Sequence, residues 1–125
     1  MNQASPEQVR AWIAQSIRRS PGEDREIEES EVQQMLARVG AAIQDGRAHL
    51  WVGAASAVVT EPLNGVRVWQ AGGDFADMVA QMTRAADILR AQGFERMTIE
   101  ETRKGWAKVL RQYNFQPFQG LELEL

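Results

Sequence analysis

Apolar residues recur at every third or fourth position in three stretches of the chain, which is the spacing of a helix with one buried face. The stretches cover residues 6–19, 31–44 and 75–92. In the third, the apolar positions are Phe75, Met78, Val79, Met82, Ala86 and Leu89. Residues that can cap the starts of these helices are Ser5, Ser30 and Asp74. Gly93 stands where a left-handed residue would end the third helix, so we predict three amphipathic helices.

Short runs of apolar and β-branched residues fill much of the rest of the chain and favour strands. These runs are residues 50–52, 57–60, 66–69, 94–101 and 121–125. The first two are close enough to form a hairpin. Residues 102–113 carry Trp106, Leu110 and Tyr113 on one side and predict a fourth helix. The last run alternates Leu with Glu, so we expect a half-buried strand at an edge of the sheet, able to pair with a second copy of the chain.

Size and composition indicate one globular α/β domain. The chain has 125 residues, of which 44% are hydrophobic and 25% charged, and no apolar run approaches the ~20 residues of a membrane helix. The absence of cysteine excludes disulfides and thiolate metal sites, and the single histidine, His49, cannot form a metal cluster by itself. A net charge of −3 argues against nucleic acid as a main partner. The first residues lack the pattern of a secretory signal, so we expect a cytoplasmic location.

The stretch from Val66 to Gly93 predicts a strand, a glycine turn at residues 70–74 and a long helix, followed by a further strand. A helix start exposes backbone N–H groups, and glycines let a phosphate approach them closely. Here Asp74 and Asp77 can satisfy the helix start themselves, so an anion would have to displace them or share their field. The alternative is an ordinary strand-to-helix turn in which glycine relieves backbone strain.

The order of these elements resembles the GNAT (Gcn5-related N-acetyltransferase) fold, with its first strand short or missing. The resemblance implies an α/β domain whose mixed central sheet is flanked by helices. In that family the amides of the turn after the fourth strand hold the pyrophosphate of acetyl-CoA. Gln70 and Gly73 match the family's pattern, whereas Phe75 occupies a position that the family gives to a small residue. The candidate cofactor-binding residues are therefore Gln70, Ala71, Gly72, Gly73, Asp74 and Phe75.

The same resemblance implies where catalytic residues would lie. The family's general-acid tyrosine falls on Leu110, and Tyr113 lies three residues later, in a different direction on the helix. Glu61, Glu100 and Glu101 lie at strand ends, where GNAT-like proteins position a glutamate that takes the amine proton. The catalytic candidates are thus these three glutamates and Tyr113. The alternative for Glu100 and Glu101 is an exposed strand end leading into a helix.

The chain also resembles small GNAT-like proteins encoded among the structural genes of tailed phages and prophages, through residues 90–94 and 103–110. This narrower resemblance implies a degenerate member with an assembly or host-directed role. We therefore expect a non-catalytic protein without a resident cofactor, which acts through contacts with phage structural proteins or with itself and is associated with a bacterial host cell or a virion. The competing hypothesis is an acetyl-CoA-dependent N-acetyltransferase acting on an unknown amine.

Overall fold

The computed structural model describes residues 4–19, 27–62, 65–99, 106, 110–111, 116–118 and 120–124. The elements, in order, are α1 (Pro6–Arg19), α2 (Glu29–Gln44), β1 (His49–Val52), β2 (Ser56–Glu61), β3 (Val66–Gly73), α3 (Phe75–Ala91), β4 (Arg96–Ile99), β5 (Gln116–Phe118) and β6 (Gly120–Glu124). None of the helices described is both long and apolar enough to cross a lipid bilayer.

The described strands form one mixed six-stranded sheet in the order β1-β2-β3-β4-β6-β5. The neighbours β3 and β4 are parallel and are joined through α3, whereas the other pairs are antiparallel. The last strand, β6, lies between β4 and β5, so the prediction that it forms an edge was wrong. The missed outer strand, Gln116–Phe118, is short and contains Pro117. Proline cannot donate to a strand ladder and therefore suits an edge position.

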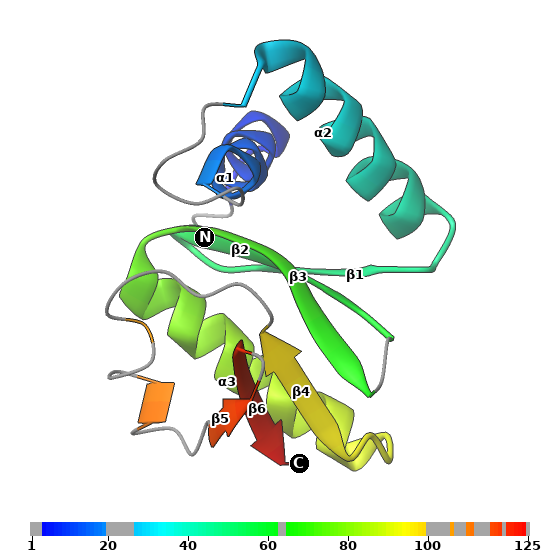
Figure 1. Ribbon diagram of the computed structural model, residues 1–125, viewed down its shortest axis with the longest axis vertical. Coiled ribbons are helices and arrows are strands. Elements are labelled where there is room, and N and C mark those ends of the chain that lie inside the picture. Colours follow the sequence, from blue (N-terminus) through cyan, green and yellow to red (C-terminus); the bar gives the residue numbers. More distant parts are fainter. Residues whose placement is uncertain are drawn as a thin grey trace.

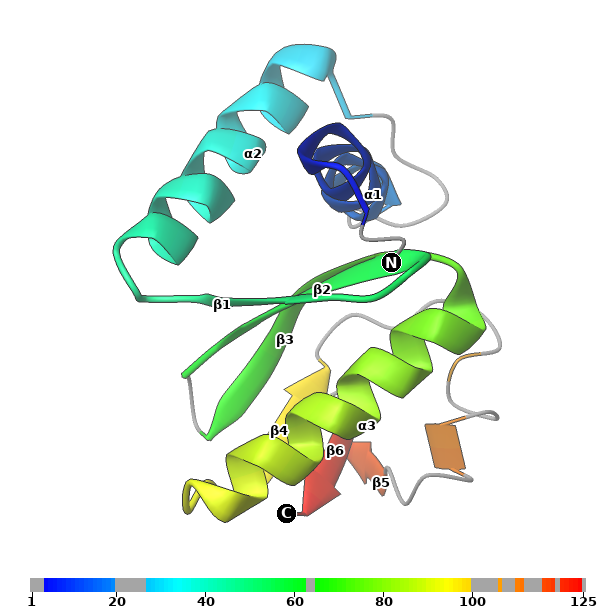
Figure 2. The same ribbon diagram turned by 180° about the vertical axis from the view of Figure 1, so that it is seen from behind.

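Helices cover both faces of the β1–β2–β3 part of the sheet (Figures 1 and 2). Alternation along β2 divides the core between the two faces: Ala57 and Val59 pack against α1 and α2, whereas Val58 packs on the side of α3. Trp106 and Leu110, from the predicted fourth helix, are buried in the cluster on the α3 side. The three amphipathic helices are therefore confirmed, with their apolar faces turned toward this sheet.

Two of the three predicted helix caps are confirmed. Ser5 forms a capping box, in which the Gln8 amide donates to Ser5 Oγ at 3.1 Å and the Ser5 amide donates to Gln8 Oε1 at 3.3 Å. Asp74 caps α3, and Gly93 follows it with a φ of 94°. The prediction for Ser30 was wrong, because α2 already begins at Glu29.

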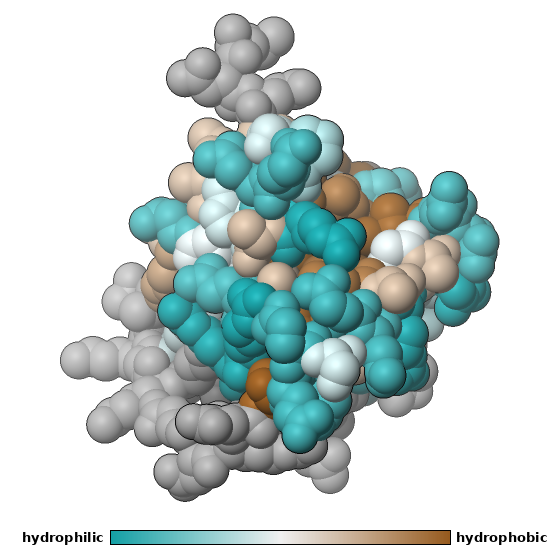
Figure 3. Space-filling view, turned by 90° about the horizontal axis from the view of Figure 1, so that it is seen from above, coloured by the Kyte–Doolittle hydropathy of each residue, from teal (hydrophilic) through white to brown (hydrophobic). Residues whose placement is uncertain are grey.

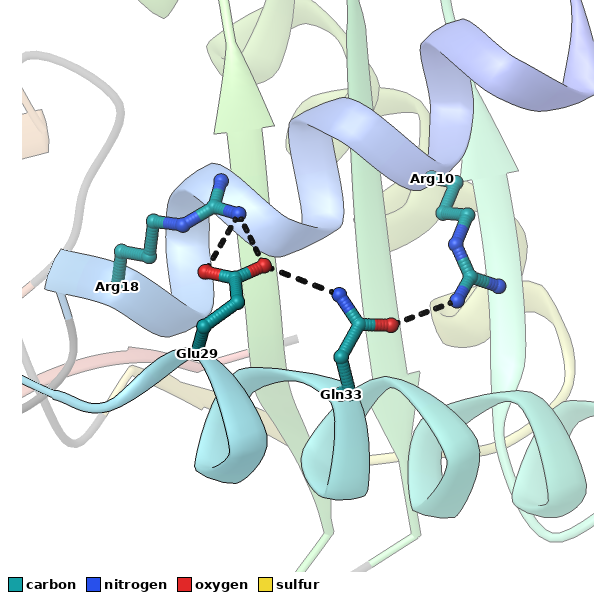
Figure 4. Close-up of polar contacts among 4 residues, drawn as sticks. All are labelled: Arg10, Arg18, Glu29 and Gln33. Atoms are coloured by element: carbon teal, nitrogen blue, oxygen red, sulfur yellow. Dashed lines mark hydrogen bonds and ion pairs between the residues drawn. The ribbon is translucent and has the colours of Figure 1, made fainter.

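The early start of α2 is stabilised by a chain of polar contacts with α1 (Figure 4). Arg18 of α1 donates to both carboxylate oxygens of Glu29, at 3.0 and 3.2 Å, and Gln33 donates to Glu29 Oε1 at 3.1 Å. Arg10 donates to Gln33 Oε1 at 3.0 Å. The hydrogen bond from Gln33, followed by the one from Arg18, lowers the pKa of Glu29 from its ordinary value of 4.5. These contacts connect α1 and α2 at the protein surface.

Candidate functional site

The stretch predicted as a glycine turn is the end of a strand, so that prediction was wrong. β3 continues to Gly73 and stays paired with β2, from Gln70 opposite Val59 to Gly73 opposite Ser56. A register shift between Val59 and Thr60 inserts Trp69 as a bulge. As a result Trp69 and Gln70 both face α1.

Among the described strands, none pairs with the other side of the bulged half of β3. In the described part of the chain, β3 pairs with β4 only at Val66 and Arg67, so the two parallel strands separate beyond that point. The Asp74 amide donates to the Ala55 carbonyl, toward β2, at 2.8 Å. Because amides alternate in direction along a strand, those of Ala71 and Gly73 point away from β2, toward the opening between β3 and β4.

Side chains of α1 accept hydrogen bonds from both of these amides. The Ala71 amide donates to Ser16 Oγ at 3.0 Å, and the Gly73 amide donates to Gln15 Oε1 at 3.1 Å. The Ser16 hydroxyl in turn donates to Gln70 Oε1 at 2.5 Å. Ser16 is 3% exposed and Gln70 is 5% exposed, so this small network is shielded from water. A ligand that needed these amides would have to displace the side chains of Gln15 and Ser16.

Glycine is required at the end of β3 for packing and for backbone conformation. A Cβ atom at Gly72 would lie 2.7 Å from the carbonyl carbon of Trp12 and closer still to its oxygen, because the backbone of α1 rests on this residue. Gly73 has a φ of 110°, and a Cβ there would lie 2.6 Å from Ser56 Cα. These constraints account for the glycine pair without a ligand.

The start of α3 is partly satisfied by the protein itself. Asp74 Oδ2 accepts from the Asp77 amide at 3.0 Å. The Asp77 carboxylate does not cap the helix as predicted; it accepts from the Ala55 amide at 3.1 Å and from the Ser56 hydroxyl at 2.5 Å, which ties α3 to the β1–β2 connection. Among the described residues, no acceptor meets the amides of Phe75 and the exposed Ala76. Within the described ranges, two amides of this helix start are therefore without an internal acceptor.

Of the catalytic candidates only Glu61 lies in the described part of the chain, because Glu100, Glu101 and Tyr113 fall outside it. Glu61 forms an ion pair with Arg67 on the neighbouring strand, and the two side chains are 21% and 23% exposed. To act as a base it would have to give up this partner. Leu110, at the position of the family's tyrosine, is fully buried and has no group that can donate a proton.

Elsewhere in the described ranges, no three His, Asp or Glu side chains are grouped so that they could hold a metal ion. His49 is exposed, and its ring centroid lies 4.3 Å from that of Trp51.

Gln15 and Ser16 were missed by the sequence reasoning. They lie on a helix 54 to 58 residues away from the strand they bind. The available signal was the placement of Ser16 on the buried face of α1, between Ile13 and Ile17. A polar side chain on such a face needs a partner, although the sequence does not say which one.

Comparison of the sequence with protein-family models and with curated proteins gives no match. Among solved structures, the PaiA N-acetyltransferase of Thermoplasma acidophilum in complex with coenzyme A is 9% identical, with a TM-score of 0.63 over 95% of this chain and 92% of that one. A GNAT family acetyltransferase of Brucella melitensis in complex with acetyl-CoA is 12% identical, with a TM-score of 0.58 over 98% of this chain and 85% of that one. The predicted fold class is confirmed: this chain has the fold of the GNAT acetyltransferases.

Proposed function

We propose that this GNAT-fold protein has lost acetyl-CoA binding at the β3–α3 junction and works through protein contacts. The observation that carries the proposal is the occupation of the junction amides by the protein's own groups. Ala71 and Gly73 donate to α1, and Asp77 donates to Asp74. Because a helix start binds anions through free amides, these internal bonds reduce that capacity to the amides of Phe75 and Ala76.

Electrostatic repulsion by Asp74 and Asp77 also disfavours acetyl-CoA binding. A pyrophosphate at this junction would lie within several ångströms of the carboxylates of Asp74 and Asp77. At the effective dielectric constant of a protein surface, each like-charge contact of that kind costs about 1–4 kcal/mol. Since about 1.4 kcal/mol corresponds to a tenfold change in affinity, the two aspartates together disfavour binding strongly.

The resemblance of residues 90–94 and 103–110 to phage and prophage proteins supports placing this role in phage assembly or in a phage-infected bacterial cell. The partner of a non-catalytic GNAT-fold protein would then be a structural or host protein.

The test is calorimetric titration with acetyl-CoA at low salt, where charge repulsion is least screened. We expect no binding by the unaltered protein up to millimolar ligand. Combining Gln15→Ala, which frees the Gly73 amide, with Asp74→Ser, which keeps a cap without the charge, should raise the affinity. Gln34→Ala, on the exposed face of α2, is the matched control and should change nothing. Micromolar binding by the unaltered protein would overturn the proposal.

The second candidate is an acetyl-CoA-dependent N-acetyltransferase. It is favoured by the two available amides, those of Phe75 and Ala76, and by the coenzyme bound in both structures of the same fold. Binding accompanied by acetyl transfer to an amine would establish this function. Glu61→Gln would then test whether Glu61 is the base, because glutamine keeps the shape of the side chain and removes its basicity.

A further inference from the structure

The outer edge of β1 is available for backbone pairing. β1 is the first strand of the sheet and has β2 as its only neighbour among the described strands. The Gly53 amide donates to the Ser56 carbonyl at 2.9 Å, which sets the alternation: His49 and Trp51 bond toward β2. The amides and carbonyls of Leu50 and Val52 therefore point outward, and no described residue is hydrogen-bonded to them. These four groups form an unpaired strand edge.

This edge opens into a groove of about 740 Å³ lined by β1, α1, α2 and α3. Leu50 and Val52 line it from the sheet. Apolar side chains from the two helices line it as well, among them Val9, Ile13, Leu36 and Ile43. In the view of Figure 3, onto the side that carries α1 and α2, brown apolar surface is visible between hydrophilic residues. Apolar pockets beside an open strand edge suit alternate side chains of an added strand.

The charge of the groove is opposite to that of the whole chain. Its lining includes Arg10 and Arg84 but, in the described part of the chain, no Asp or Glu, whereas the chain carries a net charge of −3. The guanidinium of Arg84 lies 5.8 Å from the ring centroid of Trp51, which holds it at the end of β1. Gln81 also lines the groove, and among the described residues its buried Oε1 has no hydrogen-bond partner. The charge that the groove offers to an occupant is therefore positive.

We infer that an extended acidic peptide segment of a partner protein binds in this groove as a strand beside β1. Its backbone pairs with Leu50 and Val52, every second side chain enters the apolar groove, and its carboxylates meet Arg10 and Arg84. A second copy of the chain fits less well, because a two-fold contact through β1 would bring like-charged arginine pairs together. The inference rests on the proposed role in protein contacts and names the class of partner.

The experiment selects random ten-residue peptides displayed as a library against the purified full chain, in the presence of millimolar acetyl-CoA. Enriched peptides are then synthesised and titrated individually by fluorescence anisotropy. We expect sequences in which acidic and apolar residues alternate, and binding that weakens with added salt. Calorimetric titration with acetyl-CoA tests the proposed function separately. Because Leu50 and Val52 are not among the candidate cofactor-binding residues, failure of peptide binding can be distinguished from failure of that proposal.

Charge reversal and a backbone substitution identify the site. Arg10→Glu and Arg84→Glu should each weaken binding about tenfold or more, whereas Arg38→Glu, on the exposed face of α2, should leave it within about twofold. Val52→Pro removes an outward amide that β2 does not use and should abolish binding. Where that variant does not fold, the amide NMR signals of Leu50 and Val52 in the unaltered protein must shift on peptide addition.

Three outcomes would overturn the inference. The first is enrichment of no peptide, or of peptides without acidic residues. The second is binding that the arginine reversals leave unchanged. The third is a protein that sedimentation shows to be a dimer, dissociated by Val52→Pro, since a second copy would then occupy the edge.

Discussion

Substituting Gly72 by alanine tests the close approach of α1 to β3, on which the closure of the candidate site depends. The added methyl group would lie 2.7 Å from the carbonyl carbon of Trp12, which is a backbone atom and cannot rotate away. Overpacking of this kind costs about 1–3 kcal/mol. If α1 moves to relieve it, the hydrogen bonds from Ala71 and Gly73 weaken, at about 1 kcal/mol each.

Part of this loss is offset in the unfolded chain, because alanine has less backbone freedom than glycine by about 0.4–1 kcal/mol. The expected net effect of Gly72→Ala is thus a destabilisation of about 2–3 kcal/mol. Gly40→Ala is the matched control: Gly40 lies within α2, and a Cβ there meets no atom within 4 Å. It should stabilise the protein by about 1 kcal/mol, the helix-propensity difference.

Urea denaturation measures both variants. At an m-value of about 2 kcal/mol/M, Gly72→Ala should lower the midpoint by about 1 M or more, and Gly40→Ala should raise it by about 0.5 M. The reasoning would be refuted if Gly72→Ala unfolded at or above the midpoint of the unaltered protein, because the helix would then not rest on the strand as described.

Substitutions at three further sites test the bond between α1 and β3, the cap of α3 and the polar contacts at the start of α2. Ser16→Ala should lower the free energy of unfolding by about 1–3 kcal/mol in urea, because a buried amide and a buried carbonyl lose their partner, whereas Ser30→Ala on the surface should change it by less than about 0.5 kcal/mol. In calorimetric melting, Asp74→Ala should cost about 1 kcal/mol and Asp74→Ser much less, and equal losses would speak against the cap. Because the hydrogen bond from Gln33 lowers the pKa of Glu29, its stabilisation is present above pH 4.5 and lost as the pH falls below it. The stability difference between the unaltered protein and Glu29→Gln should shrink in that range, and a difference independent of pH would contradict this.

The sequence predicted the elements whose pattern is local. The helices follow from apolar spacing and the hairpin from two short apolar runs. It failed at residues 70–73, where glycines suggest a turn but pairing with β2 and contact with α1 extend the strand. The contacts of Gln15 and Ser16 with this strand could not be predicted either, because such long-range contacts leave no periodic signal in the sequence. The partners of the junction amides therefore required the structure.

The central claim is that the amides of Ala71, Gly73 and Asp77 in this GNAT-fold protein are bonded internally and that the junction does not hold acetyl-CoA. Amide-resolved NMR tests it directly, by following the signals of residues 70–77 while acetyl-CoA is added. We expect the signals of Ala71 and Gly73 to stay in place up to millimolar ligand. Saturable shifts at micromolar ligand, centred on Gly73 and the start of α3, would contradict the account and favour the acetyltransferase.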